Sequence, residues 1–145
     1  MFYFDTSILI PLFLPEETSD KIEIFFQHLP ADTDLVISQW TRIEFASVLS
    51  RLVRMGELKK DIALLCKERF SKVLAENLQV QLPSIADFDL CWKFILRFDN
   101  SLRAGDALHL AIASNLAVET IFTLDNGMLK AGRQLGLPVA SGIIF

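Results

Sequence analysis

The sequence predicts an α/β domain built on a mainly parallel sheet, and three observations support this prediction. Short apolar runs that suit strands alternate along the chain with longer segments of helical periodicity. Residues 2–4 are continuously apolar up to Asp5, which is typical of a central parallel strand covered on both faces. The length of 145 residues suits one domain, and neither an internal repeat nor a low-complexity linker divides the chain. We therefore expect a single domain over residues 1–145.

The expected elements follow from periodicity and from turn and capping residues. A short helix begins at Asp5, Thr6 or Ser7, each of which is a good N-cap residue. Gly56 separates two long helical segments and fits a C-terminal cap, so these segments are predicted to form a helical hairpin. The expected strands are residues 2–5, 34–38, 79–83, 120–124 and 137–140. The expected longer helices are residues 17–29, 38–55, 58–78, 87–98, 105–117 and 126–136.

The composition is unusually apolar for a protein without a membrane span. Hydrophobic residues make up 52% of the chain and the mean hydropathy is +0.38, so part of the apolar surface is expected to contact a partner. No apolar run approaches the roughly 18 residues that cross a bilayer. Asp5 stands where a signal peptide would have its apolar centre, and we expect a cytoplasmic protein that does not bind membranes. Cys66 and Cys91 lie in different predicted helices without a metal-binding pattern, which predicts two core thiols.

Four acidic residues occupy places where an α/β sheet gathers its ligands. Asp5 and Asp125 follow predicted strands, and ligands bind outside the carboxyl ends of such strands. Asp5 also suits an N-cap, but Thr6 and Ser7 beside it can serve that purpose. Asp125 lies in an Asp-Asn-Gly sequence, for which ordinary turn chemistry is the alternative interpretation.

The other two acids lie on predicted helices. Glu44 falls at the margin of the apolar face of its helix, with no Lys or Arg three or four positions away, although a surface glutamate is the commoner interpretation. Asp106 follows Gly105 at the start of a helix that is apolar nearly all round, so an N-cap role and a site role are equally compatible with its position. His109 comes one turn later, and we interpret it as a hydrogen-bonded core histidine outside the site.

Clustered carboxylates suggest a hard divalent cation. Carboxylates that lie together raise one another's pKa unless a cation intervenes, and oxygen donors favour Mg²⁺ or Mn²⁺ over zinc or copper. Such a cation supports phosphodiester hydrolysis by polarising the phosphate and activating water. The net charge of −4 and pI near 5.1 argue against a simple nucleic-acid binder. Assigning four acids to a metal site leaves the remainder neutral. Basic residues available for phosphates are Arg42, Arg51, Arg54, Lys59, Lys60, Arg103, Lys130 and Arg133.

Four motifs in this order resemble a known family. FYFDTSILI, TRIEFASVL, RAGDALHLAIA and TLDNGML together resemble the PIN-domain ribonucleases, especially the VapC-type toxins of bacterial toxin–antitoxin pairs. The resemblance extends over nearly the whole chain and implies a PIN-like three-layer α/β/α fold. Met128 departs from the pattern, because the family often has an aromatic residue at that position.

The resemblance also implies a site, an activity and partners. It implies that Asp5, Glu44, Asp106 and Asp125 hold Mg²⁺ or Mn²⁺ and catalyse RNA cleavage, with Thr6 and Thr123 as supporting hydroxyls. It implies an RNA substrate, a homodimer and a cognate antitoxin protein. We expect that antitoxin to lie in an apolar groove beside the acids, with a basic residue facing the carboxylates. Some of the aromatic residues near the helices expected to flank the site are expected to belong to the core, and these residues are Phe13, Phe25, Phe26, Trp40 and Phe45.

Two alternatives differ in class from a ribonuclease. A non-catalytic PIN-like module would keep the fold and bind another protein, although the presence of all four acids argues against it. An α/β phosphoryl-transfer enzyme would use an aspartate at a strand end as nucleophile. A dehalogenase-like site would need a second aspartate at position 7, where Ser7 stands.

Overall fold

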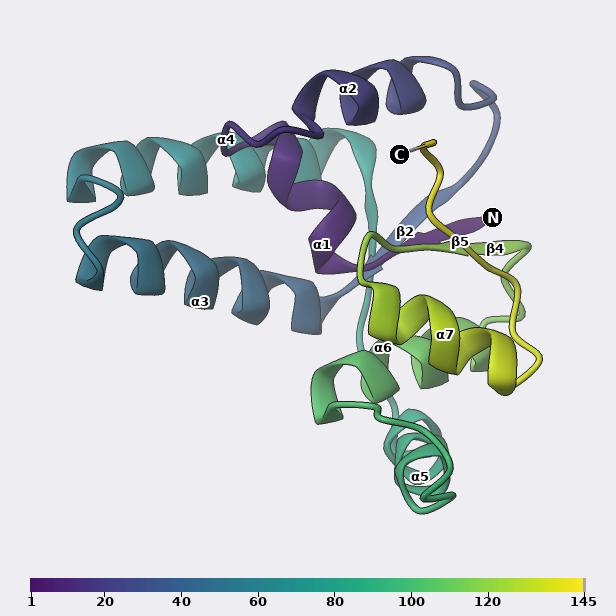
Figure 1. Cartoon of the computed structure of the whole chain (residues 1–145). Helices are drawn as coiled ribbons and strands as arrows, with labels where there is room; N and C mark the ends of the chain where they lie inside the picture. The colour runs from purple at the N-terminus through teal and green to yellow at the C-terminus, as the bar shows by residue number, and fades with distance from the viewer. Residues whose placement is uncertain (145) are drawn as a thin grey trace.

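The computed structural model describes residues 1–144 and contains a five-stranded sheet in which every pairing is parallel. The strand order is β3-β2-β1-β4-β5, so the first strand of the chain is central. This arrangement confirms the predicted α/β class (Figure 1). The strands are β1 (Phe2–Phe4), β2 (Leu35–Ser38), β3 (Gln79–Gln81), β4 (Thr120–Phe122) and β5 (Val139–Ala140).

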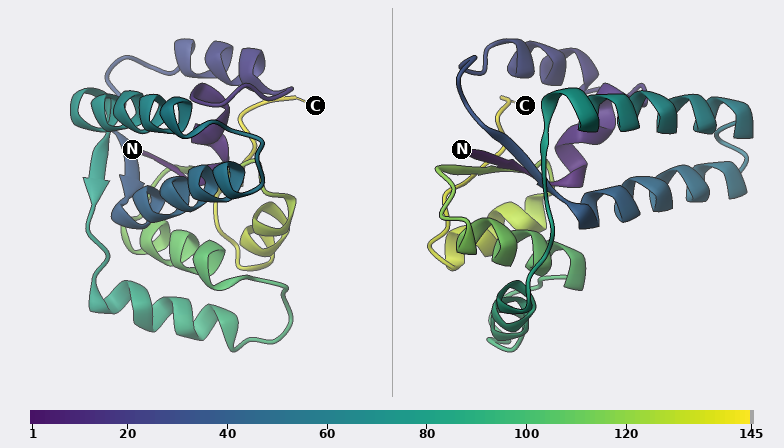
Figure 2. Two further views of the ribbon diagram at one scale, coloured as in Figure 1. Left: turned by 90° about the vertical axis from the view of Figure 1, so that its left-hand side faces the viewer. Right: turned by 180° about the vertical axis from the view of Figure 1, so that it is seen from behind.

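Helices cover both faces of the sheet, as Figures 1 and 2 show. The helices are α1 (Thr6–Leu9), α2 (Ser19–Gln27), α3 (Gln39–Arg54), α4 (Lys60–Asn77), α5 (Ile85–Ile95), α6 (Ala104–Asn115) and α7 (Asn126–Gln134), with a 3₁₀ turn η1 (Ile10–Leu12) after α1. Helices α3 and α4 lie side by side as an arm that extends away from the sheet (Figures 1 and 2). The predicted hairpin is therefore confirmed, and Gly56 adopts the left-handed φ of +73° that the turn requires.

Alternating strand residues divide the core into two layers. Phe4, Ile37 and Phe122 pack with the helices α1 to α4. Their neighbours Tyr3, Val36 and Ile121 pack with α5, α6 and α7 on the opposite face. Successive side chains of a strand point to opposite faces, so this division is what a three-layer α/β/α fold requires.

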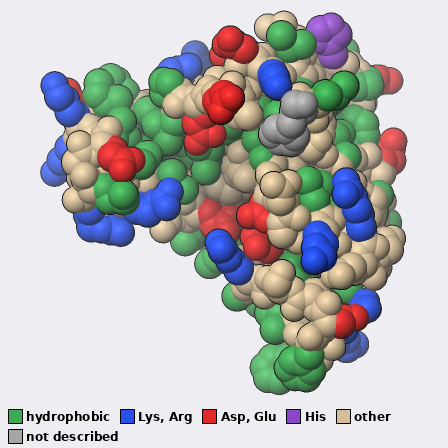
Figure 3. All heavy atoms as spheres, viewed as in Figure 1, with side chains coloured by type: hydrophobic (Ala, Val, Ile, Leu, Met, Phe, Trp, Pro, Cys, Tyr) green, Lys and Arg blue, Asp and Glu red, His purple; other side chains and the backbone are tan. Residues whose placement is uncertain are grey.

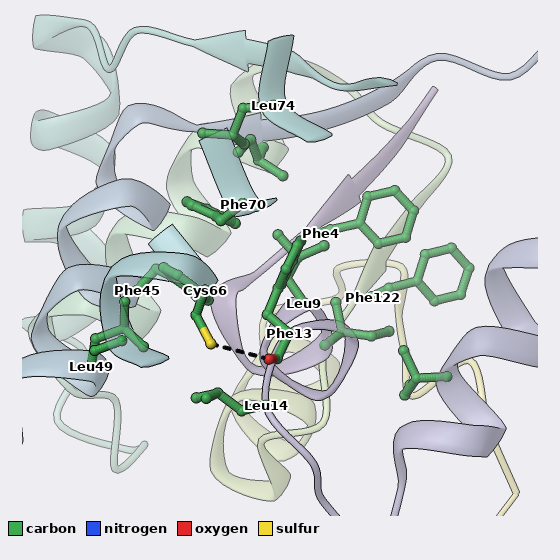
Figure 4. Packing of buried hydrophobic residues seen from close by; sticks show 14 residues of the cluster. Phe4, Leu9, Phe13, Leu14, Phe45, Leu49, Cys66, Phe70, Leu74 and Phe122 are labelled. Atoms are coloured by element: carbon green, nitrogen blue, oxygen red, sulfur yellow. Dashed lines mark hydrogen bonds between the residues drawn. The ribbon is translucent and has the colours of Figure 1, made fainter. Parts of the chain in front are cut away.

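The first of these layers is rich in phenylalanine. Phe45 of α3 and Phe70 of α4 stack with ring centroids 4.0 Å apart, and Phe13 meets both rings edge-on (Figure 4). Phe13 and Phe45 are buried, so they belong to the core, as was expected of some of these aromatic residues.

Helix α5 begins two residues earlier than expected because Ser84 and Asp87 form a reciprocal capping box. The other carboxylate oxygen of Asp87 accepts a hydrogen bond of 2.7 Å from Asn115, at the end of α6. The predicted core thiols, Cys66 and Cys91, are both buried and free. Within residues 1–144, no helix combines the length and apolarity needed to cross a membrane.

Candidate active site

The carboxyl ends of β1 and β4 lie side by side and place two of the predicted acids at one edge of the sheet. The parallel register pairs Phe4 with Phe122, and the amide of Asp5 donates to the Phe122 carbonyl at 3.1 Å. Asp5 follows β1 directly, and Asp125 follows β4 after two residues. Figure 3 shows acidic side chains in the hollow between the arm of α3 and α4 and the part of the molecule formed by α6 and α7.

Asp5 is a buried carboxylate held by hydroxyl groups. Its side chain is only 4% exposed and makes no capping hydrogen bond to α1. Ser7 Oγ donates to Asp5 Oδ1 at 2.7 Å and accepts from the Leu124 amide at 2.8 Å. Thr123 Oγ1 lies 3.2 Å from the same Ser7 oxygen. Ser7 therefore connects the carboxylate at the end of β1 to the loop that follows β4.

Burial alters the acidity of Asp5. Loss of hydration raises the pKa of Asp5 from its ordinary value of 3.8 to about 6. The charge of His109 and the hydroxyls of Ser7 and Thr123 oppose this increase without cancelling it. Asp5 thus carries an unfavourable charge at neutral pH, as expected of a residue whose counter-charge comes from a ligand.

Glu44 is placed by α3 at the edge of the same hollow, with 26% of its side chain exposed. Its Oε2 atom accepts hydrogen bonds from His109 Nε2, at 2.6 Å, and from Thr6 Oγ1. Burial alone would raise the pKa of Glu44. The hydrogen bond and charge of His109 outweigh burial, with help from Thr6 and Trp40, so the pKa lies below its ordinary range.

Asp106 lies in the first turn of α6 and interacts electrostatically with the other acids. Burial raises the pKa of Asp106, and the charges of Asp125 and Glu44 raise it further, although His109 and Arg103 act in the opposite direction. Helix α6 begins at Ala104 with Arg103 as its N-cap, so Asp106 is not the capping residue that one interpretation made it. Its carboxylate accepts no hydrogen bond from the part of the chain that the structure describes.

Asp125 is the true N-cap of α7. Its Oδ1 atom accepts a hydrogen bond of 2.8 Å from the Met128 amide, and its own amide donates to Thr123 Oγ1 at 3.0 Å. Asn126 and Gly127 are helical, so Asp125 caps a helix rather than forming the Asp-Asn-Gly turn of the alternative interpretation. Among residues 1–144, Oδ2 accepts no hydrogen bond, and the charge of Asp125 still raises the pKa of Asp106.

The arrangement fits a hard cation with an incomplete protein shell. Among residues 1–144, no three side chains of His, Cys, Asp and Glu are gathered closely enough to hold one ion as they stand. Hydrogen bonds hold Glu44 against α6 and Asp125 against α7. Mg²⁺ commonly takes one or two carboxylates and completes its shell with water and substrate phosphate. A spread set of carboxylates with uncompensated charge is compatible with that coordination.

Three residues at the site were not expected there from the sequence. Ser7 had been considered only as a cap, Tyr3 only as part of an apolar strand, and His109 only as a core residue. The alternation of β1 does place Tyr3 and Asp5 on one face, and the spacing on α6 places His109 one turn from Asp106. The alternation along β1 and the helical spacing along α6 are therefore the sequence signals that could have placed Tyr3 and His109 at the site.

A buried acidic edge on a parallel α/β sheet defines the class of the site, and comparisons identify the family. The model of the PIN domain family matches residues 2–134, and the chain belongs to this family. None of the curated proteins compared with the sequence matches it. The solved structures with similar folds include toxins and toxin–antitoxin complexes at low sequence identity.

Three of these structures illustrate the likeness. The sarcin–ricin-loop-cleaving toxin VapC20 of Mycobacterium tuberculosis is 17% identical, with a TM-score of 0.73 over 91% of this chain and 95% of that chain. FitAcB of Neisseria gonorrhoeae is 15% identical, with a TM-score of 0.71 over 98% of each chain. VapBC2 of Rickettsia felis, bound to a DNA fragment from its promoter, is 15% identical, with a TM-score of 0.74 over 97% of this chain and 98% of that chain.

The raised pKa of Asp5 predicts a specific pH dependence of stability for protein in a metal chelator. Between the unfolded pKa of 3.8 and the folded pKa of about 6, the folded state holds a proton that the unfolded state has lost. The contribution of Asp5 to stability therefore falls as the pH rises through this window. Asp5→Asn should raise the free energy of unfolding by about 2 to 4 kcal/mol above pH 7, from 1.36 kcal/mol per pKa unit. Urea denaturation from pH 4 to pH 8 measures this gain.

Asp89→Asn, at an exposed aspartate of α5, is the matched control and should change stability little at any pH. The gain from Asp5→Asn should shrink below pH 5. An equal gain at pH 4 and pH 8 would mean that the charge of Asp5 does not cause it.

Proposed function

We propose that this protein is a Mg²⁺- or Mn²⁺-dependent endoribonuclease, the toxin of a toxin–antitoxin pair. The observation that carries the proposal is the uncompensated negative charge at one edge of the sheet. Asp5 is buried with a raised pKa, and Asp106, without a hydrogen-bond partner among residues 1–144, feels both Asp125 and Glu44. Membership of the PIN domain family supports a nuclease.

Different residues would bind the cation, orient its carboxylate ligands and bind the RNA phosphate. Asp5, Glu44, Asp106 and Asp125 would hold the cation, which when bound polarises the scissile phosphate and acidifies a water molecule. Ser7 and Thr123 fix the orientation of Asp5, and Thr6 does the same for Glu44. Arg103 is exposed at the start of α6, three residues before Asp106, where it can hold an RNA phosphate.

The other basic residues named from the sequence are also exposed: Arg42, Arg51, Arg54, Lys59, Lys60, Lys130 and Arg133. Several of them lie on the arm of α3 and α4, so the charge of −4 is not spread evenly. Acidic groups gather in the hollow and cations extend along the arm beside it. A polyanion would thus contact basic side chains while its scissile phosphate meets the cation site.

Asp106→Asn is expected to abolish RNA cleavage without loss of fold, because it removes a negative oxygen ligand and keeps the size of the side chain. A loss of about 100-fold or more is expected, which corresponds to about 3 kcal/mol of transition-state stabilisation. Cleavage of mixed RNA by purified protein, with Mg²⁺, with Mn²⁺ and with chelator, measures the effect. Asp89→Asn should cleave like the wild type.

Wild-type rates in Asp106→Asn would contradict the proposed site. A wild-type protein that binds a partner but cleaves no RNA with either cation would instead be the non-catalytic PIN module.

The antitoxin partner is supported by a groove beside the site. The groove has a volume of about 370 Å³ and lies between η1 and α3. Its apolar lining is Ile10, Leu14, Pro15, Val48, Leu52 and Leu58, and its charged lining is Glu16, Arg51 and Glu57. Val48 and Leu52 follow Glu44 at intervals of four residues, so they share its face of α3. An amphipathic helix can place its apolar face here and extend a basic side chain toward Glu44. A toxin–antitoxin complex from Klebsiella pneumoniae has the same fold, which supports an antitoxin partner.

Val48→Glu should prevent co-purification with the product of the neighbouring small reading frame, because it introduces a charge into the apolar groove. Met55→Glu, at the exposed tip of the arm, should leave binding unchanged. Co-expression followed by affinity purification and an RNA cleavage assay measures both binding and inhibition. A neighbouring product that binds neither the wild type nor Met55→Glu would favour a stand-alone nuclease.

The homodimer is supported by an apolar stripe on α5. Ile85, Phe88, Trp92 and Leu96 lie at intervals of three and four residues and are all exposed, Trp92 to 70%. Figure 3 shows apolar side chains at the end of the molecule where α5 lies. Monomers rarely expose a continuous stripe of this kind, and a twofold dimer buries the same patch of both copies.

Trp92→Glu should convert the dimer to a monomer, since it places a charge in the centre of the apolar stripe. Leu65→Glu, at an exposed position of α4, should leave the dimer intact. Size-exclusion chromatography with light scattering distinguishes the two states. A monomeric wild type at micromolar concentration would show that α5 does not join two copies.

A further inference from the structure

His109 is completely enclosed and bonded through both ring nitrogens. It is 1% exposed and lies on α6, whose other buried residues are apolar. Its Nδ1 atom lies 2.7 Å from the Tyr3 hydroxyl, and its Nε2 atom lies 2.6 Å from Glu44 Oε2. These bonds join β1, α6 and α3, so one ring connects three elements that meet at the acidic hollow.

The chemistry of the partners determines where the ring proton lies. The Oε2 atom of Glu44 contacts both His109 and Thr6, and above pH 8 a glutamate side chain only accepts hydrogen bonds. His109 must therefore carry a proton on Nε2. The Tyr3 hydroxyl lies within hydrogen-bond distance of Nδ1 and can donate to it. Hydrogen on Nε2 is thus compatible with both contacts.

The two oxygens of Glu44 have different surroundings. Oε2 accepts from His109 and Thr6, whereas Oε1 faces Gly105, the residue before Asp106. A β-carbon at position 105 would lie 2.8 Å from Oε1. Gly105 lies within α6 and is not among the glycines with positive φ, so the backbone conformation does not require glycine there. The missing side chain instead leaves space for Oε1 of Glu44. The hollow thus keeps room for a carboxylate oxygen beside Asp106.

We infer that His109, with hydrogen on Nε2 and with Nδ1 bonded to the Tyr3 hydroxyl, is a positioning residue for Glu44, which it holds with Oε1 directed at the Asp106 end of α6. The tautomer and the Glu44 contact do not depend on the proposed function. The consequence for cation binding rests on it. In metal sites, removing a partner that orients a ligand typically costs about 10- to 100-fold in affinity.

The first test is nitrogen NMR of the metal-free protein at pH 8.5. His28, the only other histidine of the chain, is an internal control, because its Nδ1 lies 2.7 Å from the Ile24 carbonyl and must donate to it. His109 should show hydrogen on Nε2. Tyr3→Phe, which removes one hydroxyl and keeps the ring, should shift the Nδ1 resonance and leave hydrogen on Nε2, because Glu44 still requires it. A His109 without hydrogen on Nε2, or an Nδ1 resonance that Tyr3→Phe does not move, would overturn the inference.

The second test measures Mn²⁺ binding by calorimetry in variants of matched size. His109→Leu should weaken binding about tenfold or more, and His109→Gln should restore most of it, because the Gln amide can donate to Glu44 from a similar place. Gly105→Ala should also weaken binding, since its methyl group displaces Oε1, although alanine favours a helix by about 1 kcal/mol. Thermal unfolding identifies any variant that fails to fold.

Equal Mn²⁺ affinity in His109→Leu and the wild type would show that His109 only fills space. A wild type that binds no Mn²⁺ would refute the proposed cation site. The NMR result would then still decide whether Tyr3 and His109 position Glu44.

Discussion

The site depends on the enclosure of the Asp5 carboxylate at the end of the central strand. Asp5 cannot move toward water, because its amide is bonded to Phe122 of the neighbouring strand and Ser7 ties its side chain to Leu124. The backbone therefore holds the Asp5 carboxylate in a region of low hydration. The loss of hydration raises the pKa of Asp5. Two neighbouring segments, the Thr123–Asp125 loop and the start of α6, then bring further acids to the same place. The fold accepts an electrostatic cost here that a bound cation would remove.

The surrounding hydrogen bonds keep this charge from disrupting the core. Hydroxyl groups of Thr6, Ser7 and Thr123 all point into the cluster, and none of them brings a formal charge. A lysine or arginine in their place would neutralise the carboxylates permanently and compete with any divalent cation. Neutral donors lower the cost of burial and leave the net negative charge in place, which is the condition a removable cation requires.

Much of the fold and part of the site could be predicted from local patterns. Alternation in the strands and helical spacing placed Asp5 at a strand end and Glu44 at the margin of a buried face, and the structure agrees on both. The interaction of Glu44 with His109 spans 65 positions and that of Tyr3 with His109 spans 106, so no local pattern contains them. The start of α6 at Ala104 had no sequence signal, since Arg103 is an unusual N-cap residue.

The position of His109 also explains why one helix can serve both the core and the site. Residues 107–113 of α6 are all buried, so a polar side chain among them must find partners inside the protein. Tyr3 and Glu44 supply those partners, and the requirement to satisfy one buried ring fixes the place of a carboxylate on another helix. A buried polar pair of this kind often adds little net stability compared with apolar side chains of similar volume. Its physical contribution is therefore geometric: it selects one arrangement of α3 against α6, and with it one position of Glu44 relative to Asp106.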